Sequence, residues 1–172
     1  YPYSIGMATL TAVTPKATTG ATPYNMAIDS SGKYAYVTNY GDNTVSMYSI
    51  CQMTTKNCTR GVLTSLGTVA VPTANPLYIT ADAASVLVVT AGGDVYHYAI
   101  NSSTGALTQT SNVLNAGPGV TGISLGTSRD VFYLITSSGA TPYSYGFGTG
   151  IGAAGTALAA TGTGPFVGAA YR

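Results

Sequence analysis

Apolar and polar residues alternate along most of this chain with a period of two, which is typical of strands that bury one face. The clearest runs are rich in β-branched and aromatic residues, as strands usually are. They lie at residues 34–38, 45–50, 86–90, 95–100 and 131–136. Gly, Asp, Asn and Ser separate these runs and no window shows a helical period, so we expect an all-β fold.

The runs recur in a fixed order, which reveals an internal repeat. Each unit has a first strand, a short turn, a second strand, a Gly-containing turn and an alternating third strand, and a fourth strand closes it. Thr38, Thr90 and Thr136 align in the second strands, at intervals of 52 and 46 residues. Repeats of about 40 to 50 residues with four short strands each predict the blades of a β-propeller.

We therefore expect a single β-propeller segment over residues 1–172, with about three full four-stranded blades and a partial blade at each end. The full units are expected at about 10–50, 61–100 and 105–147, and the partial units at 1–5 and 156–172. Open strand edges promote aggregation unless they are covered. The sequence allows a partial ring, a small closed ring, or a ring completed by further chain or by other copies.

Composition excludes some classes of function. Only 6% of the residues are charged, the net charge is +1, and the six basic residues are scattered singly. Nucleic-acid binding needs a clustered basic face, so no nucleic-acid partner is expected. No apolar run approaches the roughly 20 residues of a membrane-spanning helix.

Two cysteines close together, Cys51 and Cys58, favour a disulfide that closes a small loop. A disulfide implies an oxidising compartment, so we expect a secreted or cell-surface protein, the periplasm included. Two free thiols are the alternative. A metal site would need further ligands nearby, and the only histidine of the chain is His97.

Two sites fit the acceptor sequence for N-glycosylation, Asn57-Cys-Thr59 and Asn101-Ser-Ser103. Both are expected in loops between strands. Asn57 and Asn101 would carry glycans if the protein passes through a eukaryotic secretory pathway, and they would be silent in a bacterium.

Candidate catalytic groups are few, and turn or strand positions account for them. The five carboxylates all fall in or beside predicted turns, where Asp bonds nearby backbone: Asp29, Asp42, Asp82, Asp94 and Asp130. His97 lies on the strand face opposite Tyr96 and Tyr98, which favours a packed histidine. The stretch 150–155 fits GxGxxG by letter but lacks a following helix and acid, so we interpret it as a loop. No catalytic, cofactor-binding or metal-binding residue is assigned, and no cofactor is expected.

One stretch resembles a known family. Residues 23–50 contain Tyr36-Val-Thr-Asn39 and, later, Gly41-Asp-Asn-Thr-Val-Ser-Met-Tyr48, and they resemble the YVTN-repeat, lactonase-like (6-phosphogluconolactonase-like) β-propellers. The other two units keep the pattern with Val88-Val-Thr-Ala91 and Leu134-Ile-Thr-Ser137 in place of the tetrapeptide. The resemblance implies a propeller that is typically seven-bladed and about twice this length. Some family members hydrolyse lactones, and many Ser/Thr-rich bacterial relatives are secreted or surface proteins without an assigned activity.

Two functions follow as hypotheses. The first is a non-catalytic extracytoplasmic β-propeller module for binding or self-assembly at the cell surface, with further blades or other copies as partners. The alternative is a fragment of a lactonase-type hydrolase whose active site lies largely outside this chain. A third hypothesis is a propeller that binds a substrate or an electron-transfer partner. We favour the first and a non-enzymatic role, because no acid–base pair can be assembled from the sequence.

Overall fold

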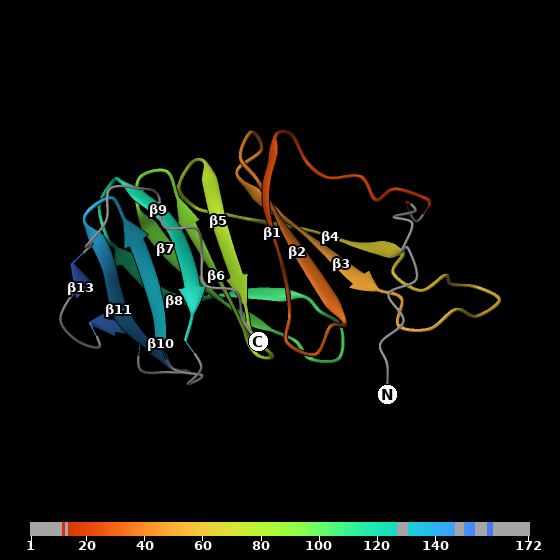
Figure 1. The fold of residues 1–172 in the computed structure, drawn as a ribbon. Coiled ribbons are helices and arrows are strands. Elements are labelled where there is room, and N and C mark those ends of the chain that lie inside the picture. Colours follow the sequence, from red (N-terminus) through yellow and green to blue (C-terminus); the bar gives the residue numbers. More distant parts are fainter. Residues whose placement is uncertain (1–11, 13, 127–130, 147–149, 154–157, 160–172) are drawn as a thin grey trace, which may run out of the picture.

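The computed structural model of the chain describes residues 12, 14–126, 131–146, 150–153 and 158–159. Within these residues it contains three antiparallel sheets and no helix (Figure 1). The first sheet consists of β1 (Pro23–Ile28), β2 (Tyr34–Asn39), β3 (Thr44–Ile50) and β4 (Leu63–Ala70). The second consists of β5 (Pro76–Ala81), β6 (Ser85–Thr90), β7 (Asp94–Ile100) and β8 (Leu107–Asn115). The third consists of β9 (Val120–Leu125), β10 (Val131–Thr136), β11 (Gly139–Gly146), β12 (Gly150–Ala153) and β13 (Leu158–Ala159).

Each sheet is a meander in which consecutive strands pair in sequence order, and β13 of the third sheet also pairs with β11. The first strands β1, β5 and β9 lie next to one another, so the sheets pack face to face around them (Figure 1). Radial packing of four-stranded meanders is the arrangement of a β-propeller. None of the described segments forms a helix that is long and apolar enough to cross a membrane.

Two faces of each sheet can be told apart by what they cover. We call the face that packs on the following sheet the trailing face, and the face that packs on the preceding sheet the leading face. The outer faces of the first and third sheets take the same names from the register positions that they share with the second sheet. The trailing face of the first sheet and the leading face of the second share one apolar core, which includes Tyr36, Met47, Val86 and Tyr98. The trailing face of the second and the leading face of the third share another, which includes Leu87, Val89, Phe132 and Leu134.

The strand register of the first sheet differs by one residue from the alignment of the repeats that the sequence suggested. Asn39, Thr90 and Thr136 are each the last residue of the second strand of their sheet, whereas the sequence aligned Thr38 with the two threonines. The sequence alignment is displaced because the hairpins that follow differ in length. Asn39 pairs with Thr44, but Thr136 pairs with Gly139. In the structure, Tyr36-Val-Thr-Asn39 therefore corresponds to residues 87–90 and 133–136.

The sheet boundaries also fall differently from the expected unit ranges. β4 is the fourth strand of the first sheet and β8 is the fourth strand of the second. The first two sheets therefore span residues 23–70 and 76–115. The loop predicted over 150–155 is wrong for residues 150–153, which form β12 and pair with β11 from Tyr143 to Gly146. Backbone pairing needs no apolar side-chain pattern, so a Gly/Ala run can serve as an outer strand. The partial unit at 1–5 lies outside the described residues, as does that at 156–172 except for β13.

Candidate functional site

His97 is the strongest candidate for a chemically active group, and it lies buried between the second and third sheets. It stands on the trailing face of β7, opposite Leu87 in the register, and its side chain is 1% exposed. Its Nε2 lies 3.0 Å from the Ser85 Oγ, and its Nδ1 lies 3.2 Å from the Thr110 Oγ1. The imidazole and the Tyr145 ring pack in a T-shaped arrangement, with their centroids 5.8 Å apart.

A carboxylate, Asp82, belongs to the same polar cluster through Tyr145 and Ser85. The Asp82 side chain accepts the backbone N–H of Ala84 and of Ser85, each at 2.7 Å, through one oxygen. Its other oxygen accepts the Tyr145 hydroxyl at 2.6 Å, which joins the second sheet to the third. Asp82 therefore fixes the turn between β5 and β6 and one contact between the sheets.

Burial controls the charge of the histidine. Desolvation lowers the pKa of His97, because an imidazolium loses more hydration than a neutral ring does; the Asp82 carboxylate opposes this shift. Hydroxyl groups can accept from one imidazole nitrogen and donate to the other, so Ser85 and Thr110 suit a neutral ring. His97 is therefore held in its neutral form in the folded protein at neutral pH.

The Ser85–His97 distance matches that of a nucleophile and its general base. The surroundings do not favour catalysis, because Ser85 is 5% exposed and lies at a sheet-to-sheet contact. In a serine triad a carboxylate orients the imidazole, but here the ring Nδ1 faces Thr110. His97 is packed in a core, as its position opposite Tyr96 and Tyr98 predicted, but the polar cluster around it was not predicted.

The other described carboxylates also bond nearby backbone or side chains. Asp29 is buried and accepts the N–H of Tyr34 at 2.7 Å and that of Ser31 at 3.1 Å. Asp42 accepts the N–H of Ala21, and Asp94 accepts the Asn115 side-chain amide at 2.7 Å. Asp130 lies outside the described residues. Within the described part of the chain, no three His, Cys, Asp or Glu side chains gather in a group that could hold a metal ion.

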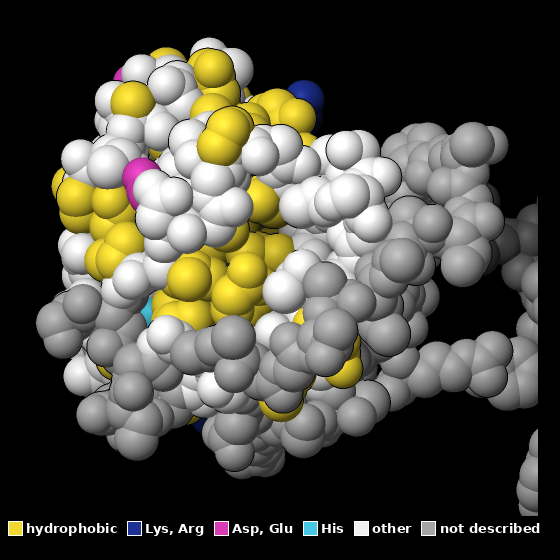
Figure 2. Space-filling view, turned by 90° about the vertical axis from the view of Figure 1, so that its left-hand side faces the viewer, with side chains coloured by type: hydrophobic (Ala, Val, Ile, Leu, Met, Phe, Trp, Pro, Cys, Tyr) yellow, Lys and Arg dark blue, Asp and Glu magenta, His cyan; other side chains and the backbone are white. Residues whose placement is uncertain are grey.

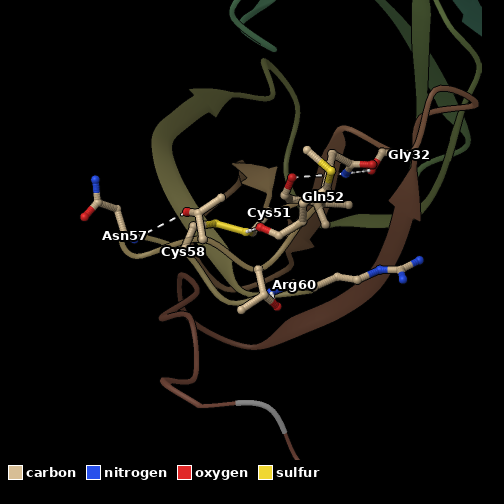
Figure 3. The surroundings of a disulfide bond; sticks show 10 residues. Gly32, Cys51, Gln52, Asn57, Cys58 and Arg60 are labelled. Carbon is tan, nitrogen blue, oxygen red and sulfur yellow. Dashed lines mark hydrogen bonds between the residues drawn. A yellow bond between two sulfur atoms is a disulfide. The ribbon is translucent and has the colours of Figure 1, made fainter.

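Cys51 and Cys58 form a disulfide, as the sequence indicated (Figure 3). The loop follows β3, and a backbone bridge between Thr55 and Cys58 narrows it further. Gln52 donates through Nε2 to the carbonyl oxygen of Gly32 at 2.6 Å, which ties the loop to the turn between β1 and β2. The disulfide thus stabilises a projecting loop at one end of the first sheet.

The two glycosylation candidates lie at corresponding places. Asn57 is exposed in the disulfide loop and points away from the sulfur atoms (Figure 3). Asn101 is exposed directly after β7, where its Oδ1 accepts the N–H of Ser103 at 3.0 Å and that of Thr104 at 3.2 Å. Both side chains are accessible, and glycan attachment at Asn57 and Asn101 remains a prediction.

An exposed apolar patch on the leading face of the first sheet was not predicted from the sequence. Met26 pairs with Val37 and Ile28 pairs with Ala35, so all four side chains share this face. Met26 is 46% exposed and Ile28 is 51% exposed. The alternation along β1 was visible in the sequence, but alternation does not say whether another sheet covers the face.

Other positions of this face are covered by the chain itself. Ala35, Val37 and Tyr48 are buried and pack with Ala17, and the Tyr48 hydroxyl donates to the carbonyl oxygen of Thr18 at 2.5 Å. The chain around Ala17 therefore shields β2 and β3, and it leaves Met26 and Ile28 on β1 open.

Comparison with known proteins supports the fold. No family model matches the chain, and no curated protein matches it in sequence. A solved structure from Bacteroides fragilis, provisionally named a 6-phosphogluconolactonase, superposes with a TM-score of 0.66 at 16% identity, covering 84% of this chain and 41% of that one. A Lactobacillus plantarum protein gives 0.57 at 22% identity, with 80% and 41% covered. Hydrazine synthase of Kuenenia stuttgartiensis gives 0.54 at 13% identity, with 79% and 36% covered.

At these identities the similarity concerns the fold alone, and it shows a lactonase-like β-propeller fold. The chain spans about two fifths of the length of the first of these structures. The wording of the tetrapeptide at Tyr36–Asn39 pointed to the same fold, although it occurs unchanged in only one of the three sheets.

Proposed function

We propose that this chain is a non-catalytic β-propeller module that acts by binding through its sheet faces, in an extracytoplasmic setting or at the cell surface. The observation that carries the proposal is the exposure of Met26 and Ile28. Their counterparts on β5, Ile79 and Ala81, occupy the same register positions and pack in the core between the first and second sheets.

The buried polar groups support a non-catalytic role. Ser85, His97 and Asp82 hold turns and sheet contacts together, and these tasks use the atoms that a hydrolase would present to a substrate. The disulfide between Cys51 and Cys58 supports an oxidising location, because cytosolic thiols are kept reduced.

A lactonase-type hydrolase of which this chain forms a part is the second candidate. It is favoured by the likeness to the Bacteroides fragilis structure, of which the chain covers 41%. In that case the catalytic residues would lie largely beyond this chain.

Incubation of the purified protein with simple lactones separates the two. A binding module leaves ring opening at the rate of the buffer, whereas ring opening that increases with protein concentration would contradict the non-catalytic proposal. A Ser85→Ala variant is the control, because loss of such activity in this variant would place it at the Ser85–His97 pair. For the location, the native protein should contain no thiol that iodoacetamide alkylates without prior reduction.

A further inference from the structure

Among the described residues, the first and third sheets carry the two halves of an interface that the molecule already forms twice inside. One half is the open part of the leading face, Met26 and Ile28 on β1. The corresponding residues of the third sheet, Ile123 and Leu125, pair with Leu134 and Phe132 and pack against the second sheet. The same strand positions are thus covered in the second and third sheets and open in the first.

The other half is the trailing face of the third sheet. Tyr133 pairs with Pro142 and Ile135 pairs with Ala140, so these side chains share the face turned away from the second sheet. Ile135 is 7% exposed and Tyr133 and Pro142 are half-buried, so this face is partly covered within the chain; Leu87, the counterpart of Tyr133 in the second sheet, is 1% exposed. Seen from the side where the third sheet lies, hydrophobic side chains gather in the middle of the surface (Figure 2).

We propose that a second copy of this chain docks head to tail, its third-sheet trailing face covering Met26 and Ile28, so that two copies close one ring. This deepens the proposed function by naming the binding partner, and it rests on that proposal. Trailing-to-leading packing is the contact that the chain makes twice within itself, so the new contact continues an established interface. A heterologous contact of this kind gives a ring when the rotation closes and a filament when it does not.

The number of sheets is compatible with a ring that two copies close. The three sheets that the structure describes in each copy give six, within the usual range of about four to eight propeller blades. One chain covers 41% of the Bacteroides fragilis propeller, so two copies supply most of the length of such a ring. Because the chain around Ala17 shields β2 and β3, the partner sheet would contact β1 mainly through its own β9 and β10.

Sedimentation equilibrium of the 172-residue protein tests the association directly. We expect a species of twice the 17.3 kDa chain mass. Replacing Met26 and Ile28 by Asp should weaken association by at least about tenfold, because charges would be buried at the contact. Tyr133→Asp should do the same from the other side. The matched control is Met53→Asp, since Met53 is 72% exposed in the disulfide loop and should leave the mass unchanged.

Mixing the two weakened variants distinguishes this geometry from others. A head-to-tail pair made of one Met26→Asp/Ile28→Asp chain and one Tyr133→Asp chain keeps one intact contact, so the mixture should associate more strongly than either variant alone. If Tyr133→Asp dimerises normally and mixing rescues nothing, the two β1 patches pack on each other and the proposal is wrong.

A wild-type protein that remains monomeric at high micromolar concentration would also overturn the proposal; further sheets of a longer polypeptide would then be the occupant. Thermal melts of each variant exclude unfolding as the cause of lost association. Val131 pairs with Ser144 and lies on the same face as Tyr133, so Val131→Asp provides a second variant of the trailing face. A monomeric protein without lactonase activity would leave the binding function standing and remove only the second copy, so the two proposals fail separately.

Discussion

The interface between the first and second sheets and the one between the second and third place different chemistry at the same strand positions. In the first, Tyr34 and Met47 face the neighbouring sheet, and in the second their register counterparts are Ser85 and His97. In the first interface, tyrosine hydroxyls donate hydrogen bonds to backbone carbonyl oxygens of the neighbouring sheet's segment. Tyr36 donates to the carbonyl oxygen of Gly105 at 3.0 Å.

The second interface depends instead on side chains that bond to other side chains, namely Ser85, His97, Thr110, Tyr145 and Asp82. Backbone acceptors do not titrate, whereas a histidine and a carboxylate do. Burial, followed by the charge of Asp29, raises the pKa of the Tyr36 hydroxyl, so this donor stays protonated. A buried histidine and a carboxylate therefore lie in the second interface at a place where the first has tyrosine hydroxyls bonded to backbone.

The largest expected loss of stability comes from removing a buried tyrosine from the interface between the first and second sheets. Tyr36 is fully buried, and Tyr36→Ala removes its ring and its bond to Gly105. We expect a loss of about 3–5 kcal/mol in the free energy of unfolding, measured by urea denaturation, as for other buried aromatic-to-alanine changes. Tyr24→Ala is the control, because Tyr24 is 53% exposed and should cost about 1 kcal/mol or less. Equal losses in the two variants would show that the tyrosine contact does not hold the sheets together.

A smaller effect should follow from crowding the same interface at Gly105. A Cβ there would lie 2.2 Å from the Cδ1 of Tyr34, and the backbone has a φ of +74°. Gly117 has nearly the same φ, +75°, but nothing within 4 Å of a Cβ. Gly117→Ala therefore reports the backbone strain alone, about 1–2 kcal/mol. Gly105→Ala should cost a further 1–3 kcal/mol or so through overpacking.

The urea midpoints of the two glycine variants give the comparison directly. If they match, the Tyr34 ring moves aside without cost, and the first interface is less tightly packed than its buried tyrosines indicate.

The sequence predicted the faces of the strands better than their partners. Alternation placed His97 opposite Tyr96 and Tyr98, because side-chain parity along a strand is fixed locally. The register was missed at Asn39, since it depends on hairpin lengths that differ among the sheets. The polar cluster was missed because Tyr145 and Asp82 lie 63 residues apart and nothing local links them.

The exposed patch was missed for a related reason. Met26 and Ile28 follow the same alternation as Ile79 and Ala81, but only the assembled sheets show that the second pair is covered and the first is not. The disulfide was predictable, because its two cysteines are neighbours in a short loop and no other cysteine competes.

The smallest expected effect is a pH dependence that belongs to the second interface alone. The folded-state pKa of His97 lies below that of the unfolded chain, so protonation favours unfolding. The stabilisation is complete above the unfolded pKa of about 6.5 and is lost as pH falls from there towards the folded pKa. The titratable groups Asp82 and Tyr145 lie at this cluster, and Tyr78 and Tyr143 pack in the same core. Of these, the Asp82 carboxylate limits the loss by attracting the imidazolium.

His97→Met tests this dependence, because Met47 fills the same position in the first sheet. Urea unfolding at pH 7.5 and pH 5.0 gives the change in stability of each protein, and the difference between them isolates His97 from the carboxylates. We expect the wild type to lose more than His97→Met, by at most about 1.4 kcal/mol per unit of pKa shift. Equal losses in the two proteins would mean that the imidazole is hydrated when it titrates. Water would then reach the space between the second and third sheets, and the two interfaces would not differ in their response to pH.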